Sequence, residues 1–265
     1  MIASVAKALN ILNLFSTTTP RLTLTTISQH LGMPKSTTHH LVSTLVQHGY
    51  LEKQEDDTYA LGRSIIALTQ SVLVNVELRD RAAPLLRKLA DACNESVYLT
   101  VRDHVRVLYI YAIESSQRLL ARTAVGDYAP LYCTAVGKAV LSFLTPEELT
   151  TVFEHYPEGF PPHTPYTITH IAQLKEQLDA TYKRGYSIDN QEHELNTYCI
   201  GAPIFDARNA VIGACSISGT DPEIIGSRLP ELTRNVLHST QEISRRMGYV
   251  PARMANVRHS TLVKS

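Results

Sequence analysis

The chain has 265 residues, 44% of them hydrophobic, so it is long enough to bury a full core and long for one small domain. Its 25 basic and 25 acidic residues balance, which excludes a uniformly basic nucleic-acid coat and confines any DNA contact to a local surface. Because it shows no secretory signal, no apolar run of about 18 residues and no paired cysteine spacing, we expect a cytoplasmic protein without membrane contact, disulfides or cofactor.

The N-terminal residues predict three helices. Residues 4–16 form the first, with Ser4 as its N-cap and a buried stripe at Val5, Leu9, Leu12 and Phe15. Residues 23–31 form the second, which ends at Gly32 because glycine tolerates the left-handed backbone of a helix C-terminus. Pro34 then suits the entry to a third helix over residues 35–48. Two short helices joined by a tight turn are typical of a DNA reader.

The third helix exposes an uncharged polar face, whose hydroxyl, imidazole and amide groups suit phosphates and base edges. A helical hairpin without any DNA role is the alternative. Residues 1–51 weigh against it, because they hold three Lys or Arg, four His and no Asp or Glu, as a polyanionic partner requires. The residues predicted to contact DNA are Lys35, Ser36, Thr37, His39, His40, Ser43, Thr44 and Gln47.

Residues 51–62 predict a hairpin around Asp56 and Asp57, which makes residues 1–62 a winged helix-turn-helix domain. The hairpin tip is acidic and therefore a poor candidate for tight phosphate contact. Residues 63–79 follow as a linker helix. Its apolar surface is wider than one small domain covers, which favours a homodimer contact. A helix buried only against its own chain is the alternative.

Residues 80–250 form a second domain in which helices and strands alternate in mixed order. This order favours an α+β fold, an antiparallel sheet with flanking helices. Helices are expected at 80–94, 134–144, 146–155, 171–184 and 229–247. Strands are expected at 96–101, 105–112, 118–123, 198–205 and 211–218. In the first of these helices Pro84 is expected in the first turn, and the tail at 251–265 is expected to be disordered.

Several motifs recur in one order along the chain. They are PKSTTHHLVSTLVQHGYL with YALG, then PLYCTAVGKAVLSFL, then GYSIDNQEHELNTYCIGAPIFD and GACSISG. Together, from about Val5 to Gly248, they closely resemble the IclR family of bacterial transcriptional regulators. The resemblance implies a winged helix-turn-helix, a dimerising linker helix and an effector-binding domain of GAF-like or profilin-like fold. It also implies a dimer or tetramer on a palindromic operator, acting as a repressor or an activator of catabolic genes.

The resemblance further implies a site for a small organic acid, such as a sugar acid or short keto acid. The matching positions are Ala135, Val136, Asp189, Cys199, Ser216 and Ser218. Backbone N–H groups after Thr134 suit a carboxylate, and Ser216 and Ser218 alternate along a strand and so share a face. Asp189 is expected to accept a hydrogen bond from a ligand hydroxyl, and Cys199 is expected to be a small residue of the pocket wall. Ordinary strand polarity for the serines and a buried core thiol for Cys199 are the alternatives.

One position departs from the family pattern, because His40 stands where the family usually has an arginine in the recognition helix. A permanent bidentate donor is thus replaced by a mostly neutral group, which puts the expected phosphate or guanine contact in doubt.

Two other functions compete with the regulator. A metal-sensing regulator would use Cys133, His193, Cys199 and Cys215, although these residues lack a local ligand pair. An enzyme is the remote alternative, since G-x-S-x-G is absent and the Cys215 segment reads as a strand rather than a nucleophile elbow. We therefore expect no catalysis.

Overall fold

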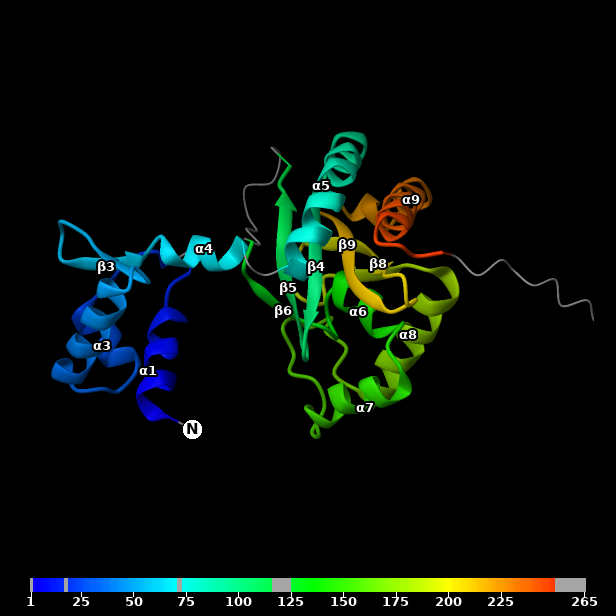
Figure 1. The fold of residues 1–265 in the computed structure, drawn as a ribbon. Coiled ribbons are helices and arrows are strands. Elements are labelled where there is room, and N and C mark those ends of the chain that lie inside the picture. The colour runs from blue at the N-terminus through cyan, green and yellow to red at the C-terminus, as the bar shows by residue number, and fades with distance from the viewer. Residues whose placement is uncertain (1, 17–18, 71–72, 116–124, 251–265) are drawn as a thin grey trace, which may run out of the picture. The chain divides into compact units, whose positions relative to one another are not determined.

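The structure, a computed structural model, describes residues 2–16, 19–70, 73–115 and 125–250 (Figure 1). The chain divides into two compact units, Met1–Val76 and Glu77–Ser265. Within the described residues, no helix is long and apolar enough to cross a membrane. The strand expected at 118–123 and the tail at 251–265 lie outside the described residues.

The first unit has the helices and the hairpin of the predicted winged helix-turn-helix. The Thr23 side chain caps the second helix by accepting the Thr26 N–H at 3.1 Å. Gly32 has φ +58°, as its position after that helix predicts. The strand β1 was not predicted, and it completes an antiparallel sheet in the order β1-β3-β2. The elements are α1 (Ala3–Leu12), β1 (Leu22–Thr23), α2 (Leu24–His30), α3 (Lys35–Gln47), β2 (Leu51–Lys53) and β3 (Thr58–Leu61).

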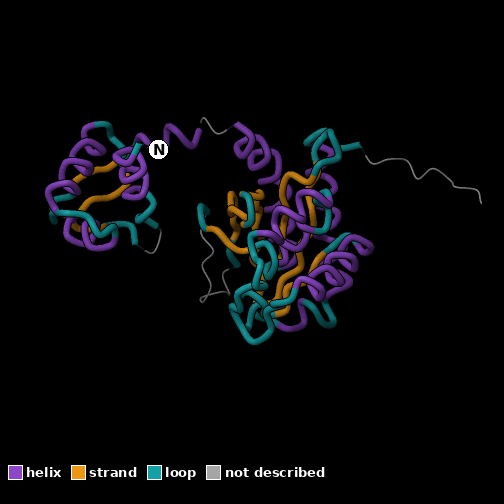
Figure 2. Tube along the Cα trace, turned by 90° about the horizontal axis from the view of Figure 1, so that it is seen from below, coloured by secondary structure: helices purple, strands orange, loops and turns teal. Residues whose placement is uncertain are grey.

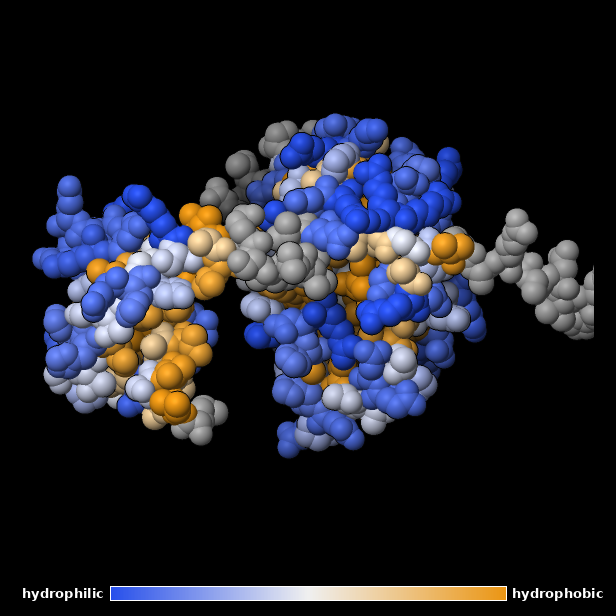
Figure 3. All heavy atoms as spheres, in the orientation of Figure 1, coloured by the Kyte–Doolittle hydropathy of each residue, from blue (hydrophilic) through white to orange (hydrophobic). Residues whose placement is uncertain are grey.

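The first helix differs from the prediction in its cap and in its buried face. Its N-cap is Ile2, so Ser4 lies inside the helix, which ends at Leu12. Of the predicted stripe, Phe15 is buried and Leu12 packs against the core, but Val5 and Leu9 are 53% and 55% exposed. Ile11, which was not predicted, is fully buried. The helix carries two apolar stripes, and the core takes the one that contains Ile11. Figure 3 shows hydrophobic residues exposed on this unit.

The predicted linker region, residues 63–79, contains one whole short helix and the start of another. Helix α4 (Ser64–Gln70) is short, and helix α5 (Leu73–Cys93) begins well before the predicted second helix. Pro84 is therefore in the interior of α5 and not in a first turn. The later part of α5 belongs to the second unit, where Leu86 and Leu89 are buried.

The second unit is built on a six-stranded antiparallel sheet with the order β6-β5-β4-β9-β8-β7. This is the α+β architecture that the order of elements predicts. Figure 2 shows the strands lying between helices. The strands are β4 (Ser96–Asp103), β5 (Arg106–Ile113), β6 (Tyr128–Pro130), β7 (Ser187–Asn190), β8 (Tyr198–Phe205) and β9 (Val211–Gly219).

Helices cover both faces of this sheet. The remaining helices are α6 (Ala135–Leu141), α7 (Pro146–Glu154), α8 (Ile171–Arg184), the 3-10 turn η1 (Pro222–Ile224) and α9 (Leu229–Arg246). Helices α5 and α9 pack on one face with Cys215 and Ile217, while α6, α7 and α8 pack on the other with Ala214. Alternate residues of β9 thus face opposite layers, so Ser216 and Ser218 face the α6 side.

Candidate functional site

The exposed face of α3 contains the residues predicted to contact DNA. All of them are exposed except Thr37, which is partly buried. Thr38, Val42 and Leu45 are buried on the opposite side and fix the helix against the core of its unit. The His39 and His40 rings meet edge to face, with centroids 6.0 Å apart. The helix therefore presents a continuous row of polar side chains without an acidic group.

The wing engages the nearby basic groups in ion pairs. Lys53 Nζ lies 2.6 Å from Asp57 Oδ1, and Arg21 lies 3.7 Å from Asp56. The Thr58 hydroxyl and N–H donate to Asp56 and lower the pKa of its carboxyl. These contacts agree with the prediction that the wing is a poor phosphate site.

The six predicted effector residues line a single cavity in the second unit, here named the inner cavity. They come from the start of α6 and from β7, β8 and β9. Its free volume is about 30 Å³, room for about two waters. It is lined by Tyr98, Tyr109, Thr134, Ala135, Val136, Asp189, His193, Glu194, Thr197, Cys199, Ser216 and Ser218.

The start of α6 reaches the sheet because Gly201 has no side chain. A Cβ at Gly201 would lie 2.6 Å from the backbone of Ala135. The Ser187 hydroxyl donates to the Ala135 carbonyl at 2.5 Å and holds this contact. Thr134 caps the helix by accepting the Gly137 N–H at 3.1 Å. The N–H groups of the first helical turn have no partner within a helix, so Ala135 and Val136 bring two donors to the cavity wall.

Asp189 is the buried acidic residue of the cavity wall, since only 3% of it is exposed, whereas Glu194 is exposed. Its Oδ1 accepts the backbone N–H of Glu192 at 2.8 Å. Burial raises the pKa of Asp189 to about 7, which the Lys138 charge opposes and the Glu192 charge reinforces. The carboxyl is thus poised between its neutral and charged forms near neutral pH.

The strand residues of the cavity face one another in register. Cys199 lies opposite Ser218, and the thiol is 3.0 Å from the serine hydroxyl. Tyr98 lies opposite Ser216, and its ring meets Tyr109 edge to face at 5.7 Å. The wall therefore combines aromatic rings with hydroxyl groups.

Sequence reasoning missed several lining residues: Tyr98, Tyr109, Thr134 as a wall residue, Glu194 and Thr197. Alternation along β4 offered a weak signal for Tyr98, but only the pairing of β4 with β9 brings it to the serines. His193 was considered only as a metal ligand. Burial and the neighbouring His163 lower the pKa of His193 to about 4, so it is neutral at pH 7.

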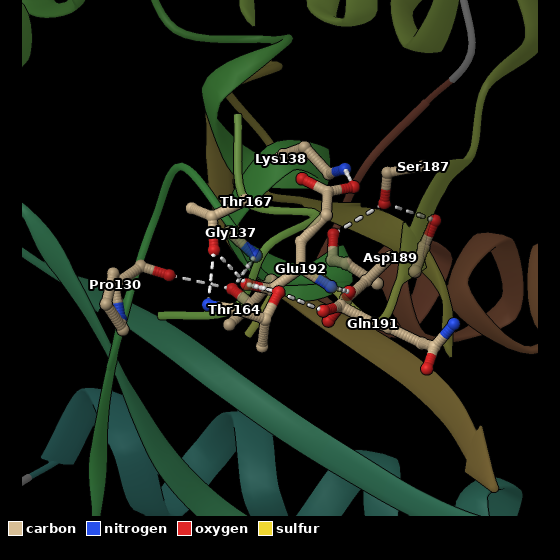
Figure 4. Close-up of polar contacts among 12 residues, drawn as sticks. Pro130, Gly137, Lys138, Thr164, Thr167, Ser187, Asp189, Gln191 and Glu192 are labelled. Atoms are coloured by element: carbon tan, nitrogen blue, oxygen red, sulfur yellow. Dashed lines mark hydrogen bonds and ion pairs between the residues drawn. The ribbon is translucent and has the colours of Figure 1, made fainter. Parts of the chain in front are cut away.

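A buried ion pair lies beside the cavity and was also missed. The Lys138 ammonium pairs with Glu192 Oε1, and the two residues are 1% and 7% exposed. Figure 4 shows the Glu192 side chain extending from its backbone to Lys138. The available signal was a single lysine within the apolar run of α6, since charged residues are rarely buried unless paired.

The four residues of the metal-sensing alternative are not brought together. Cys199 and His193 line the inner cavity, whereas Cys215 packs on the opposite face of the sheet among α5 and α9. Among the described residues there is no group of three or more His, Cys, Asp or Glu that could hold a metal ion. The positions of these four residues therefore do not support the metal-sensing alternative.

Comparisons with known proteins agree on both units. A family model for the IclR helix-turn-helix domain matches residues 4–55, and one for the bacterial transcriptional regulator IclR C-terminal domain matches residues 70–245. The HTH-type transcriptional regulator KipR of Bacillus subtilis is 34% identical over 252 residues, 93% of this chain and 97% of KipR. The acetate operon repressor of Salmonella typhimurium is 30% identical over 246 residues, 92% of this chain and 89% of the repressor.

A crystal structure of an IclR homolog from Microbacterium hydrocarbonoxydans, complexed with 4-hydroxybenzoate, has the same fold. Its TM-score is 0.83 at 22% identity, and the match covers 92% of this chain and 98% of that one.

Proposed function

The chain belongs to the IclR family of bacterial transcriptional regulators, and from that premise we propose that it is a cytoplasmic repressor of a catabolic operon, released by a small organic acid. Proteins of this family are DNA-binding regulators and not enzymes. Short keto acids and sugar acids are the candidate effectors. The relative from Salmonella is named a repressor, which favours repression over activation here.

One observation carries the effector proposal. Six residues assigned to the effector site by resemblance, spread over 84 positions from Ala135 to Ser218, line one cavity. The ordinary alternation of polar residues along one strand does not explain this shared cavity, because the six residues come from one helix and three strands. The IclR homolog of the same fold that was crystallised with 4-hydroxybenzoate supports a small acid as the ligand class.

The wall chemistry fits a carboxylate. The Ala135 and Val136 N–H groups and the Ser216 and Ser218 hydroxyls donate to its oxygens. Asp189 in its neutral form adds a further donor, whereas its charged form would repel the ligand. A neutral ligand would use these donors less well, since charge-assisted hydrogen bonds are roughly twice as strong as neutral ones.

The size of the cavity provides a mechanism for the response. The cavity has room for about two waters, so an acid larger than this must move the lining side chains or the strands that carry them as it enters. A ligand changes a protein only through unequal affinity for two conformations. We infer that the acid favours an arrangement of the second unit in which paired DNA-binding units no longer match the operator.

The DNA-binding side of the proposal requires two copies of the chain. One recognition helix reads few bases, and two helices on a palindrome double the contacts. Exposed apolar residues of α4 support a homodimer, because Ile66 and Leu68 are 64% and 50% exposed. A pair of dimers gives the tetramer.

A gel-shift titration of the full-length protein tests the coupling. Operator fragments are selected from random duplexes, and candidate acids are added at concentrations where calorimetry shows binding. An acid that binds and releases the operator supports the proposal. If every acid that measurably binds leaves operator affinity unchanged, the proposed coupling is wrong. A reporter gene under the operator then separates repression from activation.

A further inference from the structure

A second pocket lies behind β7, on the side away from the inner cavity. This outer pocket has a volume of about 330 Å³, within the size range of small-molecule sites. Successive residues of a strand point to opposite sides, so Asp189 lines the inner cavity while Ile188 and Asn190 line the outer pocket. Gln177 and Arg184, seven residues apart, contribute the wall from one face of α8.

Glu192 belongs to the outer pocket and has an unused acceptor. Its Oε1 accepts from Lys138, but its Oε2 is buried and makes no hydrogen bond within the part of the chain that the structure describes. Burial raises the pKa of the Glu192 carboxyl, while Lys138 and the nearby backbone N–H of Asn190 oppose that rise. A buried carboxylate oxygen without a donor is unfavourable, so a small movement of the pocket wall that exposes this atom would let it accept from an incoming hydroxyl or N–H group.

The remaining polar groups of the pocket are also available. The side-chain amides of Gln177 and Asn190 belong to exposed residues of the pocket wall. Arg184 is held in place because its Nε donates to the Tyr186 carbonyl at 2.6 Å and its guanidinium stacks on the Tyr186 ring. Its terminal nitrogens keep a fixed orientation and remain free to bind a carboxylate in two places.

The charges select among ligand classes. Lys138 already balances Glu192, and Arg184 adds a further positive charge, so a cationic amine is disfavoured. An apolar ligand would leave the amides, the guanidinium and Glu192 Oε2 without partners. A hydroxyl satisfies Glu192 without adding charge, and an anionic group satisfies Arg184.

We propose that the outer pocket is a second ligand site, distinct from the inner cavity, for a small polyhydroxylated carboxylate. A ligand hydroxyl donates to Glu192 Oε2, the amides of Gln177 and Asn190 bind further hydroxyls, and the ligand carboxylate lies on the Arg184 guanidinium. The backbone N–H of Glu192 donates to Asp189, which lines the inner cavity. A ligand bound in the outer pocket therefore also affects the position of Asp189 in the wall of the inner cavity.

Calorimetry on the full-length protein with three six-carbon probes tests this site. Gluconate carries hydroxyls and a carboxylate, sorbitol carries hydroxyls alone, and hexanoate carries a carboxylate alone. We expect gluconate to bind at least about tenfold more tightly than either of the others. Absence of gluconate binding at millimolar concentration, or equal binding of gluconate and hexanoate, overturns the proposal.

Matched variants locate the ligand. Arg184→Gln is expected to lower the gluconate association constant about tenfold, while Lys183→Gln removes an equal charge from the same turn of α8 and leaves it unchanged. If both variants lower the gluconate association constant equally, the effect comes from surface charge alone and the proposed site is wrong. Ser142→Ala, whose hydroxyl donates to the Lys138 carbonyl and lines neither pocket, is expected to leave gluconate binding unchanged. A loss of gluconate binding in Ser218→Ala with none in Arg184→Gln places gluconate in the inner cavity and refutes the proposal.

Glu192→Gln tests the acceptor itself, after circular dichroism has checked its fold. It is expected to weaken gluconate and leave hexanoate unchanged; an equal effect on both probes contradicts the role of Oε2. If this variant does not fold, the Arg184 and Lys183 pair still decides the proposal. None of these measurements uses DNA, so the outer pocket is tested separately from the effector response of the inner cavity.

Discussion

Cys199 and Ser218 face each other across β8 and β9, with the thiol 3.0 Å from the serine hydroxyl. Both groups line the inner cavity, so the serine hydroxyl is oriented by a neighbour that is itself part of the wall. A side chain held in this way loses little freedom when it binds a ligand, which favours a direct role in effector affinity.

Ser218→Ala is therefore expected to weaken binding of the releasing acid by about 1 kcal/mol, roughly fivefold, because one hydrogen bond is lost. Isothermal titration calorimetry measures the change. Ser142→Ala is the control, since its hydroxyl donates to the Lys138 carbonyl within α6 and lies outside the cavity wall. Unchanged affinity in Ser218→Ala would remove this serine from the effector site.

The pKa of Asp189 predicts how stability depends on pH. It rises from 3.8 to about 7 in the folded chain, so between these values the folded state holds a proton that the unfolded state releases. The contribution is fully present below about pH 4 and is lost as the pH rises to about 7, with a slope of up to about 1.4 kcal/mol per pH unit. Asp189→Asn is expected to remove this slope.

Urea unfolding from about pH 5 to about pH 8 measures the slope. Circular dichroism is the suitable signal because the chain has no tryptophan. Asp179→Asn is the control, since it removes an exposed carboxylate from α8 and should leave the slope as in the wild type. A slope that persists in Asp189→Asn would assign the pH dependence to other groups.

The sequence alone predicts those site residues whose position depends on local periodicity or on a motif of the family. The polar face of α3 follows from helical spacing, and Ser216 and Ser218 share a face because strands alternate. The first helix shows the limit of this reasoning. It has two apolar stripes, and only packing against the rest of the unit decides that Ile11 is buried and Val5 is exposed.

Contacts between distant segments could not be predicted in this way. Lys138 and Glu192 are 54 residues apart, and their pairing depends on how α6 packs against the segment after β7. Tyr98 reaches the inner cavity only because β4 pairs with β9 in a register that places it opposite Ser216. A strand register is set by the whole sheet, so a single strand does not reveal its neighbour.

His40 is predicted to contribute to operator recognition. It is exposed on α3, so His40→Ala should weaken binding to a selected operator by about 1 to 3 kcal/mol if the imidazole contacts a base edge. Fluorescence anisotropy on operator and on random duplex measures both affinities. Equal weakening on the two duplexes indicates a phosphate contact instead. His104→Ala, which changes an exposed histidine of the second unit, should alter neither affinity.

The linker helix α4 is predicted to hold the dimer together. Leu68 is 50% exposed, and Leu68→Asp places a charge on the expected contact, so the dimer should dissociate at micromolar concentration. Light scattering after size-exclusion chromatography measures the mass. Ala67→Asp adds the same charge on a different face of α4, with a loss of helix propensity at least as large, and should leave the mass unchanged. A Leu68→Asp protein with the wild-type mass would point to another interface.

The buried pair Lys138 and Glu192 gives the last prediction. Lys138→Met leaves the Glu192 carboxylate buried without its counter-charge, which should lower the free energy of unfolding by about 3 to 5 kcal/mol. The double variant with Glu192→Leu removes both charges and keeps similar volumes, so much of that loss should be recovered.

Urea unfolding of the single and double variants gives the two free energies, and their difference separates charge burial from packing. If both variants lose the same stability, the cost comes from the altered packing of α6 and not from an unpaired charge. The backbone N–H of Glu192 that donates to Asp189 is present in every variant. The double variant should therefore keep acid binding in the inner cavity while losing the acceptor of the outer pocket, so the two pockets can be separated in one folded protein.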